Sequence, residues 1–323
     1  MTTRRQFLLA GALGALSPRY TEAQARPPRV GILAPRPKTP ETLMASLLER
    51  LAELGYREGA GMLLEFRSAD GVADRYPRLA HELIDKKCDL LFAFGDLAIA
   101  AFRDARTPIP VVFISPDSDP LERGYVESLR RPGRNMTGVY VPAPTLAAKR
   151  LEIALEVLPA ARRFFVLVDV YSTDQLVALR KAAETRRVEL SVVEYEPHRD
   201  DLAAAFETAR RARIEAMIGF MSPQFFGSRA KLAALIASHR IAAFFPSYMA
   251  EQAGILLSYH TDLYWLSRKA AEFGDKILKG AKPADIPVEQ PDAIDLVVNL
   301  KTAKTLGIKI PYSVLARATK VIE

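Results

Sequence analysis

The densest group of side chains able to do chemistry is the run Ser115-Pro116-Asp117-Ser118-Asp119-Pro120. It follows an apolar stretch at 110–114 that predicts a β-strand, and open α/β sheets bind ligands beyond the carboxyl ends of their strands. Two carboxylates one residue apart can hold a cation or a ligand amine, and the same residues can form an Asx turn that caps the next helix. Both interpretations stand for Asp117, whereas Asp119, before Pro120, fits the cap.

Other predicted strands also end in groups that can bind a small molecule. Backbone N–H groups at the helix starts after Gly95 and Ser222 can hold a carboxylate, and tyrosines can stack on an apolar ligand. Each residue alone is also explained as a cap or turn, so it is their joint position at strand ends that makes them candidates. With Ser115 and Asp117, the candidate ligand-binding residues are Pro35, Arg36, Gly95, Asp96, Asp169, Tyr171, Ser172, Ser222, Pro223, Tyr248 and Glu251.

Motifs of the common enzyme classes are missing from the sequence. There is no phosphate-binding G-x-x-x-x-G-K-[ST] loop and no G-x-S-x-G nucleophile elbow. His81-Glu82 begins like a zinc-binding H-E-x-x-H motif, but Asp85 stands where the second histidine belongs. The single cysteine, Cys88, excludes an internal disulfide and any multi-cysteine metal site. We therefore expect a protein that is not an enzyme and that binds no metal or cofactor.

Short apolar runs alternate with amphipathic segments and predict two successive α/β units. Continuous apolar strands separated by helices indicate parallel sheets buried on both faces. The predicted fold class is α/β, with two doubly wound parallel-sheet lobes joined by hinge crossovers. We assign 26–140 plus 260–290 to lobe 1 and 141–259 plus 291–323 to lobe 2. Strands are expected at 29–34, 62–67, 89–94, 110–114, 163–168, 189–195, 216–220, 242–246 and, last in the chain, 295–299.

The first 25 residues have the order of a secretory signal. Arg4-Arg5 precedes an apolar stretch at 7–16, and Ala23-Gln24-Ala25 supplies a small-x-small cleavage site. Adjacent arginines followed by x-Phe-Leu point to the twin-arginine route. No cysteine lies near the cleavage site, so we expect a periplasmic protein without a lipid anchor.

Composition and charge indicate an ordinary globular protein. The 323 residues are 49% hydrophobic and 26% charged, with a net charge of +7. Removing Arg4, Arg5 and Arg19 together with Glu22 lowers that charge to +5. The basic residues are scattered and form no stripe with interleaved aromatics, which argues against nucleic acid as a partner.

Several long strings resemble periplasmic substrate-binding proteins of ABC importers, of the tryptophan/tyrosine-binding type. The resemblance runs almost the full length after the signal and is specific because the strings are long. They are 51–59 (LAELGYREG), 65–71 (EFRSADG), 128–139 (SLRRPGRNMTGV), 275–291 (DKILKGAKPADIPVEQP) and 296–304 (LVVNLKTAK).

This resemblance implies a type I periplasmic-binding fold with three crossovers, no cofactor, and a small organic ligand such as an aromatic amino acid or related carboxylate. It also implies an ABC permease as partner, and we expect a monomer. A ligand-binding subunit of an extracytoplasmic sensor is the alternative. Two departures from the family pattern, Asp96-Leu97 after Gly95 and Arg134 in place of a glycine, leave the ligand open.

Overall fold

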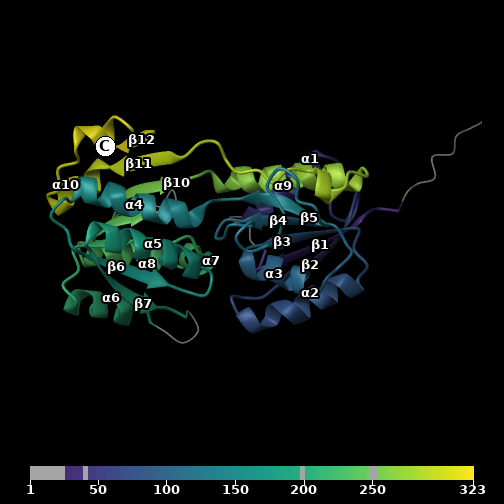
Figure 1. Ribbon diagram of the computed structural model, residues 1–323, viewed down its shortest axis with the longest axis horizontal. Coiled ribbons are helices and arrows are strands. Elements are labelled where there is room, and N and C mark those ends of the chain that lie inside the picture. The colour runs from purple at the N-terminus through teal and green to yellow at the C-terminus, as the bar shows by residue number, and fades with distance from the viewer. Residues whose placement is uncertain (1–25, 39–42, 197–200, 247–253) are drawn as a thin grey trace, which may run out of the picture.

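Five apolar segments form a fully parallel sheet in the first lobe, in the order β2-β1-β3-β4-β5. The computed structural model describes residues 26–38, 43–196, 201–246 and 254–323, and Figure 1 shows them as two lobes side by side. β1, β3 and β4 are almost wholly buried because helices cover both faces of the sheet. The strands are β1 (Arg29–Ala34), β2 (Leu63–Ser68), β3 (Leu90–Phe94), β4 (Val111–Ser115) and β5 (Met136–Tyr140).

Four helices cover the first sheet, two on each face. α1 (Leu43–Glu53) and α9 (Leu263–Leu278) pack against each other and share an apolar core with β1 and β3. α2 (Tyr76–Asp85) and α3 (Asp96–Asp104) pack on the opposite face, where Cys88 is also buried. α9 is far from the others in sequence, so the chain returns to the first lobe after building most of the second (Figure 1).

A seven-stranded sheet forms the second lobe, in the order β12-β11-β10-β9-β8-β6-β7. α4 and α5 pack side by side, and α6 contacts α8. The strands are β6 (Arg163–Val168), β7 (Glu189–Glu194), β8 (Ala216–Ile218), β9 (Ala242–Phe245), β10 (Ile255–His260), β11 (Asp295–Asn299) and β12 (Lys320–Ile322). The helices are α4 (Ala143–Val157), α5 (Thr173–Arg186), α6 (Leu202–Arg211), α7 (Pro223–Gly227), α8 (Arg229–Ser238), α10 (Leu300–Leu306) and α11 (Tyr312–Leu315).

Three short segments carry the chain between the lobes. They lie at 141–142, at 261–262 and at 290–294, between elements that belong to different lobes. Just before the third segment, Glu289 still pairs with the first lobe, where its N–H donates to the carbonyl of Gly138 at 3.1 Å. Each lobe is therefore assembled from segments that are distant in the sequence.

The expected α/β fold with two doubly wound lobes is confirmed, and four strand predictions are corrected. β10 was not predicted as a strand, and it lies between β9 and β11 in the second sheet. β5 was not predicted because its Met-Thr-Gly start interrupts an apolar run, although the strand is fully buried. β12 follows 295–299 as the last strand, and it is short and largely exposed. β11 runs antiparallel to β10, so the second sheet is mixed rather than purely parallel. Within the described ranges, no helix is long and apolar enough to cross a membrane.

Candidate functional site

A pocket of about 160 Å³ lies where the two lobes meet, at the carboxyl ends of β1 and β3. Its walls are mainly apolar, and five sequence candidates line it. The first lobe supplies Ala34, Pro35, Arg36, Pro37, Leu43, Met44, Phe94, Gly95, Pro116 and Leu263, and the second supplies Met221, Ser222, Pro223, Phe226, Gly227 and Arg229. Since an apolar cavity of about 150 Å³ can hold benzene, this pocket has room for one aromatic ring.

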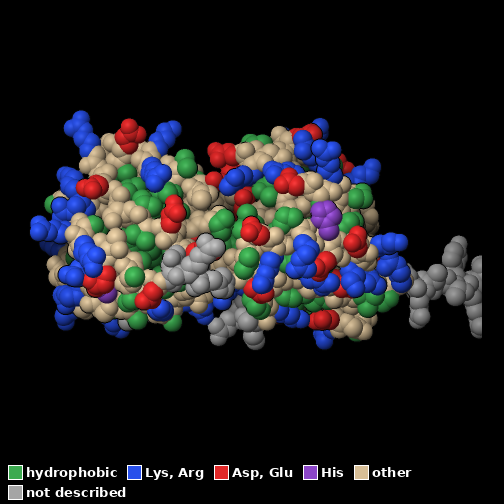
Figure 2. All heavy atoms as spheres, turned by 90° about the horizontal axis from the view of Figure 1, so that it is seen from below, with side chains coloured by type: hydrophobic (Ala, Val, Ile, Leu, Met, Phe, Trp, Pro, Cys, Tyr) green, Lys and Arg blue, Asp and Glu red, His purple; other side chains and the backbone are tan. Residues whose placement is uncertain are grey.

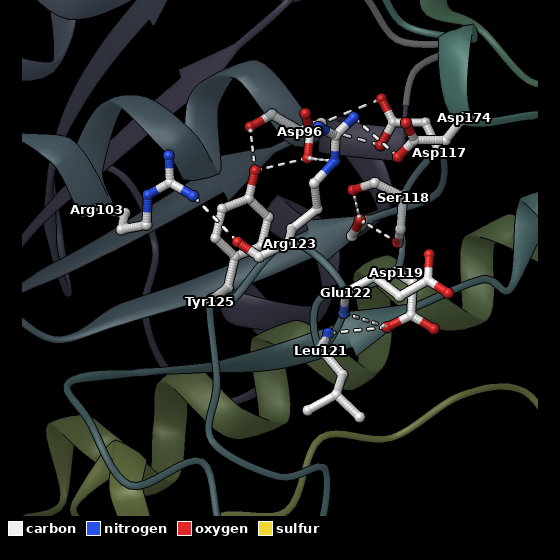
Figure 3. A network of polar contacts seen from close by, with 11 residues as sticks. Asp96, Arg103, Asp117, Ser118, Asp119, Leu121, Glu122, Arg123, Tyr125 and Asp174 are labelled. Carbon is white, nitrogen blue, oxygen red and sulfur yellow. Dashed lines mark hydrogen bonds and ion pairs between the residues drawn. The ribbon is translucent and has the colours of Figure 1, made fainter. Parts of the chain in front are cut away.

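Gly95 and Asp96 form the junction between β3 and α3 at the edge of the pocket. Gly95 is the residue before the helix and has φ of 80°, a conformation that favours glycine. The Asp96 carboxylate does not point freely into the pocket: it accepts a 2.5 Å hydrogen bond from the Tyr125 hydroxyl and lies 3.4 Å from Nε of Arg123. Figure 3 shows these groups converging from the first lobe. The Asp96 side chain therefore holds the first lobe's own loops together.

Asp117 is the buried carboxylate of the site. It is 1% exposed, and it accepts from the backbone N–H of Asp96, whose nitrogen lies 3.3 Å from Oδ1 and 3.4 Å from Oδ2. Burial raises the pKa of Asp117 to about 8, and the charges of Asp96 and Asp169 add to the effect. No lysine or arginine of the described chain forms an ion pair with it. A carboxylate in such surroundings is stabilised when it takes up a proton or when a cationic group lies beside it.

The remaining residues of this run have structural contacts. Asp119 accepts from the N–H groups of Leu121 and Glu122 at 2.8 and 3.3 Å, so its expected capping role is confirmed, although a turn follows rather than a helix. The Ser115 hydroxyl lies 2.8 Å from both the carbonyl and the hydroxyl of Ser118. These bonds fix the loop that carries Asp117 (Figure 3).

Four candidates of the second lobe form one buried hydrogen-bond cluster. The Ser172 hydroxyl donates to Oδ1 of Asp169 at 2.7 Å, and Oδ2 of Asp169 accepts from the Ser222 hydroxyl. The N–H of Tyr171 also donates to Oδ1 at 3.1 Å. Burial raises the pKa of Asp169, while the bonds from Ser222 and Ser172 act in the opposite direction. Asp169 is thus satisfied within its own lobe and positions Ser222 at the pocket wall.

Gln175 fixes the second-lobe wall of the pocket and was not predicted. Its side-chain amide donates to the carbonyl of Met221 at 2.7 Å and accepts from the N–H of Met221 at 2.8 Å. The side chain is fully buried on α5. These two hydrogen bonds to the Met221 backbone hold the Met221-Ser222 turn in place beside the pocket.

The lobes touch each other directly, and apart from Tyr171 the residues that make these contacts were not predicted. The hydroxyls of Tyr76 and Tyr171 lie 3.1 Å apart, and both tyrosines are buried. Nη2 of Arg123 lies 2.8 Å from Oδ2 of Asp174, as Figure 3 shows. The Gln224 amide also donates to the carbonyl of Gly71 at 3.2 Å. The structure therefore has the lobes closed on each other around the pocket.

Two of the candidates, Tyr248 and Glu251, lie outside the described residues. All the other candidates occur where strands of the two sheets end near the lobe boundary. Among the described residues, no group of three histidine, cysteine, aspartate or glutamate side chains can hold a metal ion. On the face shown in Figure 2, basic side chains are interspersed with acidic ones over both lobes.

Comparison with known families identifies this two-lobed arrangement. The family model of ABC transporter substrate binding proteins matches residues 41–322. The chain belongs to this family. The match spans both lobes, so it confirms the resemblance seen in the sequence strings and makes the protein a substrate-binding protein of the ABC transporter type.

Individual relatives agree with this assignment. A tyrosine-binding protein of Clostridioides difficile is 24% identical over 267 residues, which cover 81% of this chain and 75% of that protein. A Streptococcus pneumonia protein solved in complex with L-Trp is 23% identical, with a TM-score of 0.78 over 91% of this chain and 99% of that one. A ligand-free, open substrate-binding protein of Clostridium difficile is 21% identical, with a TM-score of 0.61 over 91% and 99% of the two chains.

Proposed function

We propose that this protein is the periplasmic solute-binding component of an ABC importer and captures a small organic solute between its lobes. The solute class that fits best is an aromatic amino acid or a related carboxylate. The observation that carries the proposal is the apolar pocket of about 160 Å³ to which both lobes contribute. A solute there is buried by closure of the lobes and released when they separate.

The mechanism requires binding and closure but no bond making. The pocket accommodates a ring-sized apolar group, and buried Asp117 lies next to Gly95 at its edge. A Cβ placed on Gly95 would lie in ordinary contact with Oδ2 of Asp117, at 3.4 Å, and the φ of 80° at Gly95 is what favours glycine at this position. A ligand that touches both lobes stabilises the closed arrangement by its differential affinity for that state.

Export supports the importer role. The twin-arginine signal expected at 1–25 delivers a folded protein to the periplasm, and the relatives named above bind tyrosine or L-Trp. The partner we propose is an ABC permease of the inner membrane, and the protein works as a monomer.

A thermal-shift screen of the exported chain tests the proposal. The panel contains amino acids, aromatic acids and short aliphatic carboxylates, and calorimetry then measures Kd for each hit. A solute at 100 times its Kd stabilises the protein by about 2.7 kcal/mol. If no member of the panel raises the melting temperature, solute binding is wrong. If a solute binds but pull-down of the membrane fraction recovers a receptor instead of a permease, the importer role is wrong.

A further inference from the structure

Arg36 occupies a distinctive place in the pocket. It follows β1, which lies beside the central strand β3 of the first sheet, and it stands between Pro35 and Pro37. Both prolines fix their backbone φ angle, so the segment that carries Arg36 has few conformations. Arg36 lines the pocket and is half-buried. Its side chain is therefore presented to the solute by a stiff segment of the first lobe.

The Arg36 guanidinium also reaches the second lobe and packs on Gly227 at the end of α7. A Cβ built on Gly227 would lie 2.1 Å from Nη1 and 2.3 Å from Cζ of Arg36. These separations are far below van der Waals contact, so the guanidinium fills the space that any larger residue at this position would need. The two lobes thus meet at a cationic group on the pocket wall.

Arg36 has no anionic partner among the described residues. No hydrogen bond or ion pair joins it to any residue of the described chain, whereas Arg229 on the same pocket lies over the Phe226 ring and donates to its carbonyl. A guanidinium that is partly removed from water and surrounded by apolar walls gains most from a planar oxyanion, which can accept two parallel hydrogen bonds from it. A carboxylate is the small organic group with this geometry.

We propose that Arg36 is the carboxylate-binding residue of the solute site and that the solutes are monocarboxylates with an aromatic or similarly apolar body. The acid group lies at the junction of Arg36 and Gly227, and the apolar body fills the pocket. This assignment rests on the proposed solute-binding function and narrows its substrate class. Because the guanidinium touches both lobes, the bound carboxylate also favours their closure.

Matched acid and amide pairs test this assignment by calorimetry. The probes are tryptophan with tryptophanamide, indole-3-acetate with indole-3-acetamide, and 3-phenylpropionate with its amide. The wild-type protein is expected to bind the acids about 10- to 100-fold more tightly than the amides, as for hydrogen bonds to charged groups. Arg36→Met removes this preference, and Arg36→Lys keeps part of it because a point charge replaces the planar fork. Arg180→Met is the control, since it changes the net charge equally on the exposed side of α5.

A second variant keeps the positive charge of Arg36 but displaces its guanidinium. Gly227→Ala places a methyl group where the guanidinium lies, and the flexible end of Arg36 is displaced. Acid affinity should fall although Arg36 is present, and circular dichroism checks that both variants fold. Unchanged acid preference in Arg36→Met or in Gly227→Ala overturns the assignment. Equal binding of acids and amides by the wild-type protein overturns it while solute capture stands, and no binding of any probe or screened solute removes the proposed function itself.

Discussion

Arg123 of the first lobe and Asp174 of the second form an ion pair across the lobe boundary, with Nη2 2.8 Å from Oδ2. The pair exists only while the lobes are closed, so it adds to the stability of the closed state. The two side chains are 37% and 30% exposed, and such a pair contributes about 0.2–1 kcal/mol. Arg123→Ala should therefore weaken solute binding by up to ~5-fold, as calorimetry measures.

The matched control for this prediction is Arg210→Ala, which removes an exposed pair with Glu207 that lies within α6. It should leave Kd unchanged because both partners move with one lobe. The effect of Arg123→Ala should also shrink at high salt, where exposed charges are screened. Equal Kd values for the two variants would show that the interlobe pair does not contribute to closure.

The contact between the Tyr76 and Tyr171 hydroxyls also joins the lobes and is deeply buried. Tyr171→Phe leaves the Tyr76 hydroxyl without this partner in the closed state, at a cost of about 1–3 kcal/mol. We expect Kd to rise by about 5- to 150-fold, mainly through faster dissociation. Replacing both tyrosines should be less harmful than the sum of the single changes, and surface plasmon resonance on all four proteins tests this. Strictly additive effects would mean that the hydroxyls do not interact in the closed state.

Asp117 should make the stability of the solute-free protein depend on pH. Its pKa is about 8 in the folded protein, well above the value near 3.8 of an ordinary aspartate, so the folded state binds more protons than the unfolded chain between these values. The contribution of Asp117 to stability is thus fully present below about pH 4 and is lost as pH rises to 8, by at most ~1.4 kcal/mol per pH unit. Asp117→Asn removes this slope.

Urea denaturation of wild-type protein and Asp117→Asn between pH 4 and 9 measures the difference. The variant should be more stable than the wild type at pH 8 and above, because it buries no charge. Parallel pH curves for the two proteins would contradict the prediction. If the solute carries an ammonium group, Asp117→Asn should also weaken its binding, and an unchanged Kd would remove Asp117 from amine recognition.

Arg150 on α4 is a buried cation with little compensation. Nη1 donates to the carbonyl of Tyr259 at 3.3 Å, while Nε and Nη2 have no hydrogen-bond partner in the described chain, and burial lowers the pKa of Arg150 to about 9. Since the lowered pKa means that folding buries an unfavourable charge below pH 9, Arg150→Met should stabilise the protein at pH 7. Replacing buried ions by apolar residues of similar volume gains about 1–4 kcal/mol, less about 1 kcal/mol for the lost bond. A decrease in the free energy of unfolding by urea would show that the guanidinium is better solvated than these contacts indicate.

The sequence predicts those parts of the fold that local pattern determines. β3 and β4 are continuous apolar runs, and their burial between helices follows from that pattern. β5 escapes prediction because Gly138 lies within it, where a Cβ would come 2.1 Å from the carbonyl oxygen of Phe113. That glycine reflects close strand packing, which appears only once the sheet is assembled. The direction of β11 is likewise set by the third crossover and not by its own residues.

The candidate site divides in the same way. Gly95, Asp117, Asp169 and Ser222 could be found because parallel strands bring their carboxyl ends to one edge of the sheet. Tyr76 and Arg123 could not, because their roles depend on how closely two separate lobes approach. Tyr76 is a buried core residue of an amphipathic helix, and only its distance to Tyr171 shows that it also contacts the second lobe.

The late position of α9 in the chain bears on how the protein is synthesised. β1 to β5 are complete at residue 140, but α9, which covers one face of their sheet, begins at residue 263. At 5–20 residues per second, the ribosome needs ~6–25 s to make the roughly 120 residues between them. During this interval α1 covers only part of that face, so the nascent first lobe exposes the apolar surface on which α9 later packs. Chaperone binding to ribosome-bound chains should therefore peak between these two lengths and end once α9 has emerged.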